Sequence, residues 1–391
     1  MGLEGIADLP LHSGHVPPWL AKIMKRLAEA IITLMAEEYG PAKVVERLSN
    51  PLWFQALNNV IGMDWDSSGS TTVTTGILRE ITWKRRDLGI IVLGGKGTRA
   101  RNVPEEIPVA AERLGLSSKR VEELIRASML TAKTDNALLQ DGYTLYHHSL
   151  IVAETGDYAV IQQGMNTERR MARRYHWYNP RRFVDDPHSA VAGRKHSIVL
   201  NIVSTESHGA RETMLDLARE KPEKILRDYM EAYRRLKGMP SILSYVTGTG
   251  TGTIRIDPVK RAVIYKPLPL SRKLLDRLRQ LYEVQPKRIE DLLLVRGVGP
   301  STIRALILIS DLVYGEPPST RDPVNTPFDP FIYAYAIGGK DGVPYPIDRR
   351  KALEVVETLE QIIESARIGD KEKIRALKRL SRIKLRFRIA Y

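Results

Sequence analysis

The centre of the chain, residues 133–177, is its richest stretch in side chains that could do chemistry. Carboxylate, imidazole and amide groups concentrate there: Asp135, Gln140, Asp141, His147, His148, Gln162 and Gln163. The whole chain has only seven Gln and eight His, so this density indicates a specific hydrogen-bonding or catalytic role. Carboxylates and imidazoles activate water, either directly or by holding a metal ion. The candidate catalytic residues are Asp135, Asp141, His148 and Gln163, and the candidate ligands for a divalent metal such as Mg²⁺ are Asp135, Asp141 and His147.

A β-hairpin is expected to position this cluster, with strands over residues 143–153 and 158–163. A four-residue turn would place Ala153 opposite Tyr158 and His148 beside Gln163. A shift of one residue would exchange the two faces of each strand. The alternative to a functional site is a buried polar network that pins the hairpin to the N-terminal helices.

An arginine-rich segment follows the hairpin. Residues 167–174 are expected to form a helix, and Arg173 and Arg174 are followed closely by His176 and Trp177. Guanidinium groups bind phosphates and aromatic rings stack on unpaired bases, so these four residues are candidates for nucleic-acid binding. The alternative is a basic surface helix whose aromatic side chains pack inward. The turn 185–188 pairs carboxylates with His188, an arrangement that is as often structural as catalytic.

A helix–turn–helix pattern spans residues 289–311. Gly297 and Gly299 allow a sharp reversal, and Pro300 suits the first turn of the second helix. Free N–H groups at that helix start, near Ser301, would favour a phosphate. The pattern resembles the helix-hairpin-helix motif of DNA repair enzymes, which grips the sugar-phosphate backbone. The alternative is an ordinary turn between two core helices.

A second glycine-rich stretch, residues 94–97, follows a short expected strand over 90–93. It does not match the nucleotide-binding phosphate loop, because Lys96 precedes Gly97. Lys96 and Arg99 remain candidates for a backbone-phosphate clamp, against the alternative of a solvated loop.

Composition favours a polyanionic partner. The formal net charge is +14 over 391 residues. A basic domain of this kind typically binds nucleic acid, here expected to be DNA. A generally basic proteome would be the alternative explanation. The chain has no cysteine, which excludes disulfides and thiolate chemistry, and its few amides are typical of a thermophile. No membrane-length apolar run or signal peptide is visible, so we expect a cytoplasmic protein without a membrane partner.

The expected fold class is α+β. Residues 1–255 should form a larger mixed domain around the central hairpin, and residues 256–391 a mainly helical domain with a basic C-terminus. The boundary is placed near the alternating Thr and Gly of residues 247–253. Residues 64–72 are expected to be a loop and residues 383–389 a closing strand.

Several short motifs together resemble a conserved prokaryotic family of unknown function, DUF763. They are WFQAL at 53–57, DWDSSG at 64–69, GGKG at 94–97, QDGY at 140–143, LYHH at 145–148, IQQGMN at 161–166, ARRYHW at 172–177 and GGKDG at 338–342. This resemblance covers nearly the whole chain and implies no activity.

Three functions remain open. The first is a DNA-processing hydrolase, either a nuclease or a monofunctional base-excision glycosylase. Resemblance to helix-hairpin-helix glycosylases makes Asp322 the candidate acid, while Ser301 in place of Lys excludes the Schiff-base variant. The second is a non-catalytic DNA or RNA binder, and the third is an enzyme acting on a phosphorylated small molecule.

Overall fold

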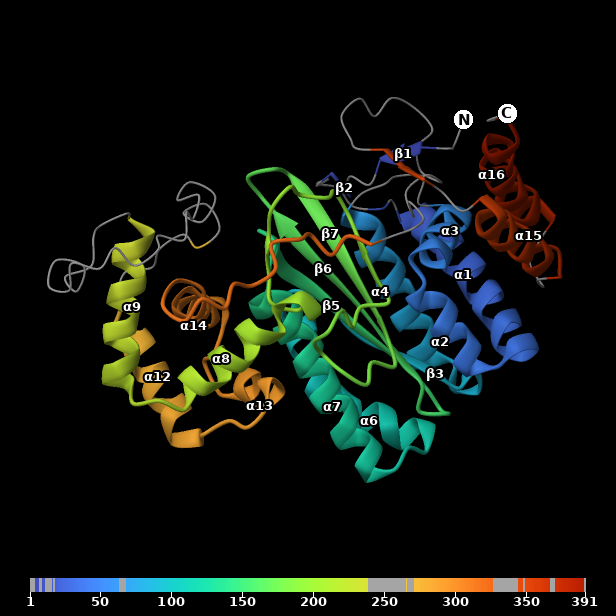
Figure 1. Cartoon of the computed structure of the whole chain (residues 1–391). Helices are drawn as coiled ribbons and strands as arrows, with labels where there is room; N and C mark the ends of the chain where they lie inside the picture. The colour runs from blue at the N-terminus through green and yellow to red at the C-terminus, as the bar shows by residue number, and fades with distance from the viewer. Residues whose placement is uncertain are drawn as a thin grey trace, which may run out of the picture.

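The protein is an α+β molecule, as expected, with an antiparallel sheet flanked by helices (Figure 1). This computed structural model describes residues 4–6, 9–10, 16, 18–62, 68–237, 265, 271–325, 344–346, 349–365 and 370–389. Both the expected domain boundary at 247–255 and the GGKDG motif at 338–342 lie outside the described residues.

The central sheet runs in the order β2-β7-β6-β5-β3, and all its pairings are antiparallel. Its long strands are β3 (Ile90–Lys96), β5 (Thr144–Ala153), β6 (Tyr158–Asn166) and β7 (Met171–Tyr178). Two short strands, β2 (Leu9–Pro10) and β8 (Ala190–Ala192), both pair with β7. The expected strand over residues 90–93 therefore continues through the glycines to Lys96.

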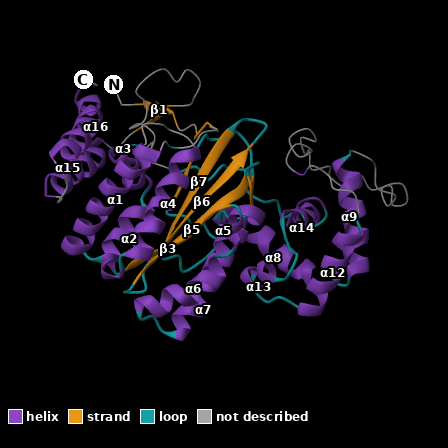
Figure 2. Ribbon diagram, turned by 180° about the vertical axis from the view of Figure 1, so that it is seen from behind, coloured by secondary structure: helices purple, strands orange, loops and turns teal. Residues whose placement is uncertain are grey.

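Helices cover both faces of this sheet (Figure 2). Val92 and Ile151 belong to the apolar cluster on one face, with α1 (Pro18–Tyr39), α2 (Pro41–Ser49), α3 (Pro51–Ile61) and α4 (Ser68–Lys84). Ile91 and Leu150 belong to the cluster on the other face, with α6 (Val103–Leu114) and α7 (Ser118–Lys133). Successive residues of a strand point to opposite faces, so each strand contributes to both clusters. The polar residues of these strands are divided in the same way.

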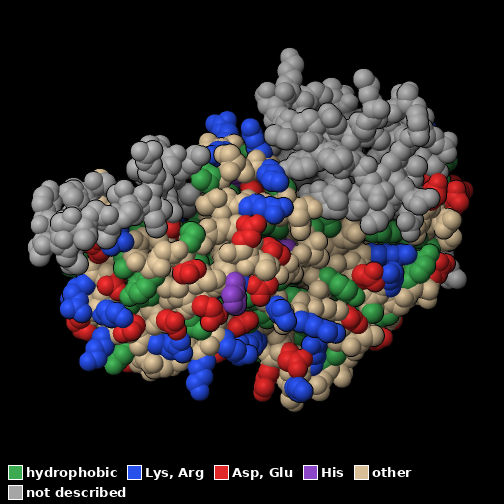
Figure 3. Space-filling model, in the orientation of Figure 1, with side chains coloured by type: hydrophobic (Ala, Val, Ile, Leu, Met, Phe, Trp, Pro, Cys, Tyr) green, Lys and Arg blue, Asp and Glu red, His purple; other side chains and the backbone are tan. Residues whose placement is uncertain are grey.

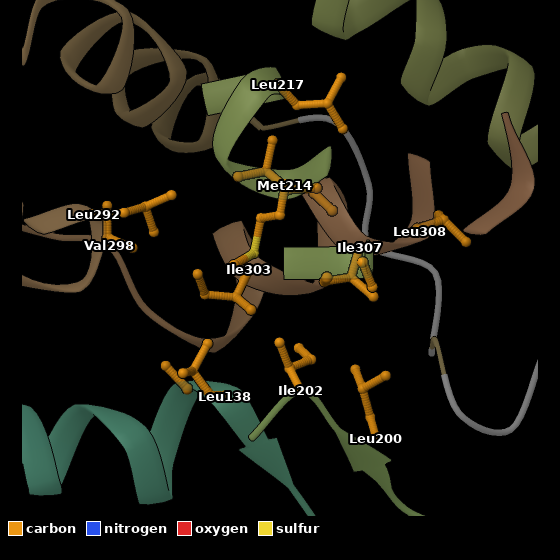
Figure 4. Packing of buried hydrophobic residues seen from close by; sticks show 14 of the residues in the cluster. Leu138, Leu200, Ile202, Met214, Leu217, Leu292, Val298, Ile303, Ile307 and Leu308 are labelled. Carbon is orange, nitrogen blue, oxygen red and sulfur yellow. The ribbon is translucent and has the colours of Figure 1, made fainter. Parts of the chain in front are cut away.

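A helical unit packs beside the sheet around a third apolar cluster. It contains α8 (His208–Ala218), α9 (Pro222–Leu236), α12 (Arg272–Val284), α13 (Ile289–Leu294) and α14 (Pro300–Leu312). Figure 4 shows Ile303 of α14 between Met214 of α8 and Leu138. The cluster thus joins helices from both sides of residue 255.

The last two helices, α15 (Arg349–Ser365) and α16 (Asp370–Ile389), return to the N-terminal part. Leu359 and Leu380 belong to the same apolar cluster as Met24 of α1. The strand expected over residues 383–389 is wrong, because these residues continue α16. At the opposite end of the chain, β1 (Glu4–Ile6) pairs with β10 (Pro344–Pro346).

Short elements connect these layers and carry several candidate residues. They are the turns η1 (Arg86–Leu88) and η3 (Thr205–Ser207), the helix α5 (Thr98–Arg101), the π-helical turn η2 (Thr134–Leu138), and the paired strands β4 (Leu139–Gln140) and β9 (Leu200–Asn201).

Two further expectations about local structure are wrong. The helix expected over residues 167–174 is instead a turn followed by β7, because residues 171–178 pair along the whole of β6. The expected loop 64–72 is helical from Ser68 onward, where Thr71 turns inward and bonds to Gln163. In both places long-range pairing overrides the local composition.

The hairpin register also differs by one residue from the expected one. Ala153 N–H donates to Asp157 O at 2.9 Å, and Gly156 adopts a φ of +88°. The turn is therefore tighter than four residues, with the glycine supplying the left-handed conformation that such turns require. As a result His148 lies opposite Gln162, and His147 opposite Gln163.

Among the helices that the structure describes, none is long and apolar enough to cross a membrane.

Candidate functional sites

The expected catalytic cluster is split between the two faces of the sheet. His148 and Gln162 face α7, whereas His147 and Gln163 face the N-terminal helices. All four side chains are buried, with exposed fractions of 5% or less. The four candidate catalytic residues Asp135, Asp141, His148 and Gln163 therefore do not line one open cleft.

A hydrogen-bonded chain runs along the face toward α7. His148 contacts Ser128 Oγ through Nε2 and Gln162 Oε1 through Nδ1, both at 2.9 Å. Gln162 Nε2 donates to Asp135 at 2.5 Å, and Trp177 Nε1 donates to the same oxygen at 2.9 Å. Burial lowers the pKa of His148, which favours the neutral ring in this chain. Trp177, expected to stack on bases, is instead a buried partner of Asp135.

The opposite face carries a second buried network. Gln163 Oε1 accepts a hydrogen bond from Thr71 at 2.5 Å, and Arg174 Nε donates to the same hydroxyl at 2.8 Å. His147 Nε2 lies 3.2 Å from Thr75 Oγ1 and 3.0 Å from Ser149 Oγ. These bonds connect β5, β6 and β7 to α4. They form a buried polar network between the hairpin and an N-terminal helix, which is the alternative to a functional site.

The four residues expected at a nucleic-acid surface in this segment are all inside the protein. Arg173, Arg174, His176 and Trp177 each have 0% exposed area. His176 packs edge-on against Phe54, with ring centroids 6.0 Å apart. Direct contact with a phosphate or a base needs accessible side chains. The expectation that these four residues lie on a nucleic-acid-binding surface is therefore wrong.

Arg173 is the centre of a buried ionic cluster. Its guanidinium donates to Asp141 Oδ2 at 2.7 Å and to Asp322 Oδ2 at 2.6 Å, and no side chain of the three is exposed. Tyr175 OH also donates to Asp141, at 2.8 Å. Burial raises the pKa of Asp141, and Arg173 offsets this only in part because it is shared with the second carboxylate, Asp322. The two carboxylates raise the pKa of Arg173 above its usual value despite burial.

Within the described residues, no His, Asp or Glu side chains are grouped in threes as metal ligands. Asp135 and Asp141 are engaged by Trp177 and Arg173, and His147 lies on the other face of the sheet. The expected ligand set Asp135, Asp141 and His147 is therefore not assembled.

The helix–turn–helix pattern folds as a compact turn between α13 and α14. Gly297 has a φ of +83°, and Val298, 1% exposed, packs beside Leu292 (Figure 4). Lys133 Nζ donates to Val298 O, and Gln140 Nε2 donates to Pro300 O at 3.0 Å. The turn is thus anchored on both sides, while Ser301 stays exposed at the start of α14.

Only one of the two turn glycines is required by the backbone. Gly299 has an extended φ of −155°, and a Cβ placed there would meet nothing within 4 Å. A Cβ on Gly297, in contrast, would lie 2.2 Å from Cζ of Arg277. The guanidinium of Arg277 therefore lies directly against the turn.

The second glycine-rich stretch presents its cations outward. Lys96 ends β3 and Arg99 lies in α5, and both side chains are exposed. Lys96 Nζ lies 5.9 Å from the ring centre of Tyr146. This surface is accessible to a phosphate backbone.

A cavity of about 460 Å³ lies between residues 186–206 and residues 321–325. His188, Lys195 and Asp322 line it. His188 Nε2 contacts Asp135 Oδ1 at 2.5 Å, and this buried carboxylate lies in the π-helical turn η2, a rare element that is often found at functional sites.

The sequence showed His188 only as part of an Asp-rich turn. In the structure its partner is Asp135, 53 positions away, whereas Asp185 contacts Arg211 and Asp186 accepts from Thr205 at 2.9 Å. No local signal predicts such a pair, and Lys195 carries no signal at all. Asp322, the candidate glycosylase acid, does line the cavity, but Arg173 and the His196 N–H both donate to its Oδ2.

The fold is an antiparallel sheet between two helical layers, joined to a helical unit that holds the turn. The chain belongs to the family DUF763, described as a protein of unknown function, which it matches over residues 5–347. No curated protein and no solved structure matches the chain.

The buried histidines predict how stability depends on pH. Burial lowers the pKa of His147 to about 3, and it holds the pKa of His176 well below the usual value. Below pH about 6.5 the unfolded chain takes up protons that the folded chain excludes, so stability should fall as the pH decreases. Each such histidine contributes up to about 1.4 kcal/mol per pH unit.

Urea unfolding between pH 7.5 and 4.5 measures this effect. A His147→Gln variant keeps a hydrogen-bonding group near Thr75 but cannot titrate, so its stability should fall less steeply than that of the wild type. Equal slopes for the two proteins would contradict the assignment of His147.

Proposed function

We propose that the protein binds DNA through the sugar-phosphate backbone, using the turn between α13 and α14. The observation that carries this proposal is Gly299, a glycine that the fold does not require. Its φ is extended and the space beside it is open. A glycine at such a place allows close approach of another chain to the protein backbone.

The chemistry around Gly299 suits a phosphate. The first N–H groups of α14 have no partner within the helix, and a helix start favours an anion. Arg277 lies against Gly297, and Arg296 is exposed beside it. The anchors from Lys133 and Gln140 hold the turn in a fixed shape, so little ordering is needed on binding.

Net charge supports a polyanionic ligand without locating its site. On the described part of the face in Figure 3, Lys and Arg side chains are interspersed with Asp and Glu. The formal charge of +14 therefore favours nucleic acid in general, and the turn supplies the specific geometry. Lys96 and Arg99 remain candidates for a second backbone contact.

The two glycines should respond differently to substitution. Gly299→Val should fold normally, because valine adopts an extended φ and finds open space. Its side chain would cover the N–H groups, so we expect duplex affinity to fall about tenfold, a loss of about 1.4 kcal/mol. Gly297→Val should also lower the melting temperature, because its φ of +83° is unfavourable for valine.

Fluorescence anisotropy with a labelled duplex, together with thermal melting, checks this expectation. Gly76→Val is the matched control, since Gly76 is exposed in α4 and has open space beside it. A folded Gly299→Val protein with wild-type affinity would remove the turn from DNA binding.

Hydrolysis of the bound DNA is a separate proposal. The expected catalytic cluster is buried, and Asp322 accepts a hydrogen bond from Arg173. Groups with acid–base chemistry that line the cavity include His188, with a largely buried side chain, and Glu206, with an exposed one. An enzyme acting on a phosphorylated small molecule would use the same cavity.

A further inference from the structure

The cavity between residues 186–206 and 321–325 has a fixed imidazole in its wall. The His188 side chain is 4% exposed, and its Nε2 is occupied by Asp135. Nδ1 is the ring nitrogen that remains for the cavity. Asp135 also accepts hydrogen bonds from Gln162 and Trp177, and the Trp177 ring lies 4.2 Å from the His188 ring, so neither partner is free to turn away.

The acidic side chains of the lining accept hydrogen bonds from other groups of the protein. Asp186 Oδ2 accepts from the Thr205 N–H and hydroxyl at 3.1 and 2.9 Å. Asp322 is held by Arg173 and by the His196 N–H at 2.7 Å. Lys195 is exposed at the rim, and within the described residues no ion pair engages it.

The rest of the lining is mixed: three apolar residues stand beside polar and charged ones, namely Asn201, Ser204, Thr205, Glu206, Arg321 and Asn325. Val191 and Val324 are buried in the cavity wall, and Pro323 lies next to Val324. A ligand for this site needs a flat face for Pro323, polar edges for the imidazole and the other polar side chains, and a negative charge for Lys195. A bare anion at Lys195 would leave Pro323 and His188 without a partner, and an apolar molecule would leave His188 unpaired.

We propose that the cavity receives one unpaired nucleotide of the bound DNA strand. Its base would lie against the half-buried Pro323 with a polar edge at His188, and its phosphate at Lys195. The volume of about 460 Å³ lies in the range of small-ligand sites, about 300–1,000 Å³. This inference rests on the proposed DNA binding and names the form of DNA that binds best.

One short segment supports both the turn and the cavity. Lys133 and Gln140, at its ends, hold the carbonyls of Val298 and Pro300. Asp135, between them, holds His188. A strand on the turn and a nucleotide in the cavity would therefore share one rigid support.

The test compares two duplexes of equal length, one fully paired and one with a single bulged nucleotide. Removing a nucleotide from a paired stack costs a few kcal/mol, and a bulge avoids this cost. We expect wild-type protein to bind the bulged duplex at least about tenfold more tightly, about 1.4 kcal/mol. Lys195→Ala and His188→Gln should bring the ratio close to one while leaving affinity for the paired duplex unchanged.

The controls separate this inference from the proposed function. Lys119→Ala removes an equal charge from the exposed start of α7 and should leave the ratio unchanged. Gly299→Val should weaken both duplexes and keep the ratio. Adenosine monophosphate, titrated by calorimetry, probes the cavity without the turn, and its binding should be lost in Lys195→Ala.

The outcomes are distinct. Paired and bulged duplexes bound equally by the wild type would overturn the cavity inference and leave DNA binding intact. Absence of all duplex binding would overturn the proposed function, while monophosphate binding that depends on Lys195 would still support a nucleotide cavity. Failure of both duplex and monophosphate binding would overturn both proposals.

Discussion

An Arg173→Met variant is expected to lose about 3–5 kcal/mol of folding free energy, because it leaves two buried carboxylates without their cation. Asp141 and Asp322 contact the same guanidinium at 2.7 and 2.6 Å, and both are fully buried in their side chains. Methionine has a similar length, so lost charge rather than lost volume should dominate. Denaturant unfolding measures the change directly.

Two comparisons make this result specific to the ionic cluster. Arg182→Met changes an exposed arginine and should alter stability by no more than about 0.5 kcal/mol. Combining Arg173→Met with Asp141→Asn and Asp322→Asn removes all three charges and should recover part of the loss. A loss below about 1 kcal/mol in the single variant would show that these three groups are not paired in a buried cluster.

An Asp135→Asn variant should lose about 2–3 kcal/mol, since charge-assisted hydrogen bonds are worth about 1.5–3 kcal/mol and buried donors lose their acceptor. Asp135 accepts from Gln162, Trp177 and His188 while having no exposed area. The amide group of asparagine would present N–H groups toward one of these donors.

His188→Gln should cost much less than Asp135→Asn, because His188 is one of three donors and lies in the cavity wall. Asp216→Asn, at an acid with a 72% exposed side chain, serves as the control. Thermal melting of the three variants checks the order. Equal losses in Asp135→Asn and His188→Gln would make His188 a structural residue and weaken its place in a ligand site.

Local patterns in the sequence predicted the turn between α13 and α14 and the central hairpin. The Gly-Val-Gly-Pro order between two apolar periods corresponds to the turn between α13 and α14, with Val298 buried as the spacing suggests. The central hairpin and the concentration of polar groups on it are also present. These features depend on residues close together in the sequence, and they can therefore be predicted from it.

Strand register and tertiary contacts, which join distant segments, determine the features that local patterns in the sequence could not predict. The one-residue register shift paired His148 with Gln162 instead of Gln163, so that His148 and Gln163 lie on opposite faces of the sheet and the expected cluster is divided. Arg173 and Arg174 looked like surface cations, but pairing of β7 with β6 carried them inside, next to carboxylates and amides from distant segments. The contact of His188 with Asp135 depends on the same tertiary arrangement.

Duplex affinity measured against salt tests DNA binding through the backbone most directly. Two paired duplexes of equal length and unrelated sequence should bind the wild type equally, and log affinity should fall linearly with log salt, with a slope of about −2 to −4 if the turn and its cations contact two to four phosphates. Arg296→Ala should reduce the magnitude of that slope by about one unit. Binding that is insensitive to salt, or confined to one of the two sequences, would contradict the account.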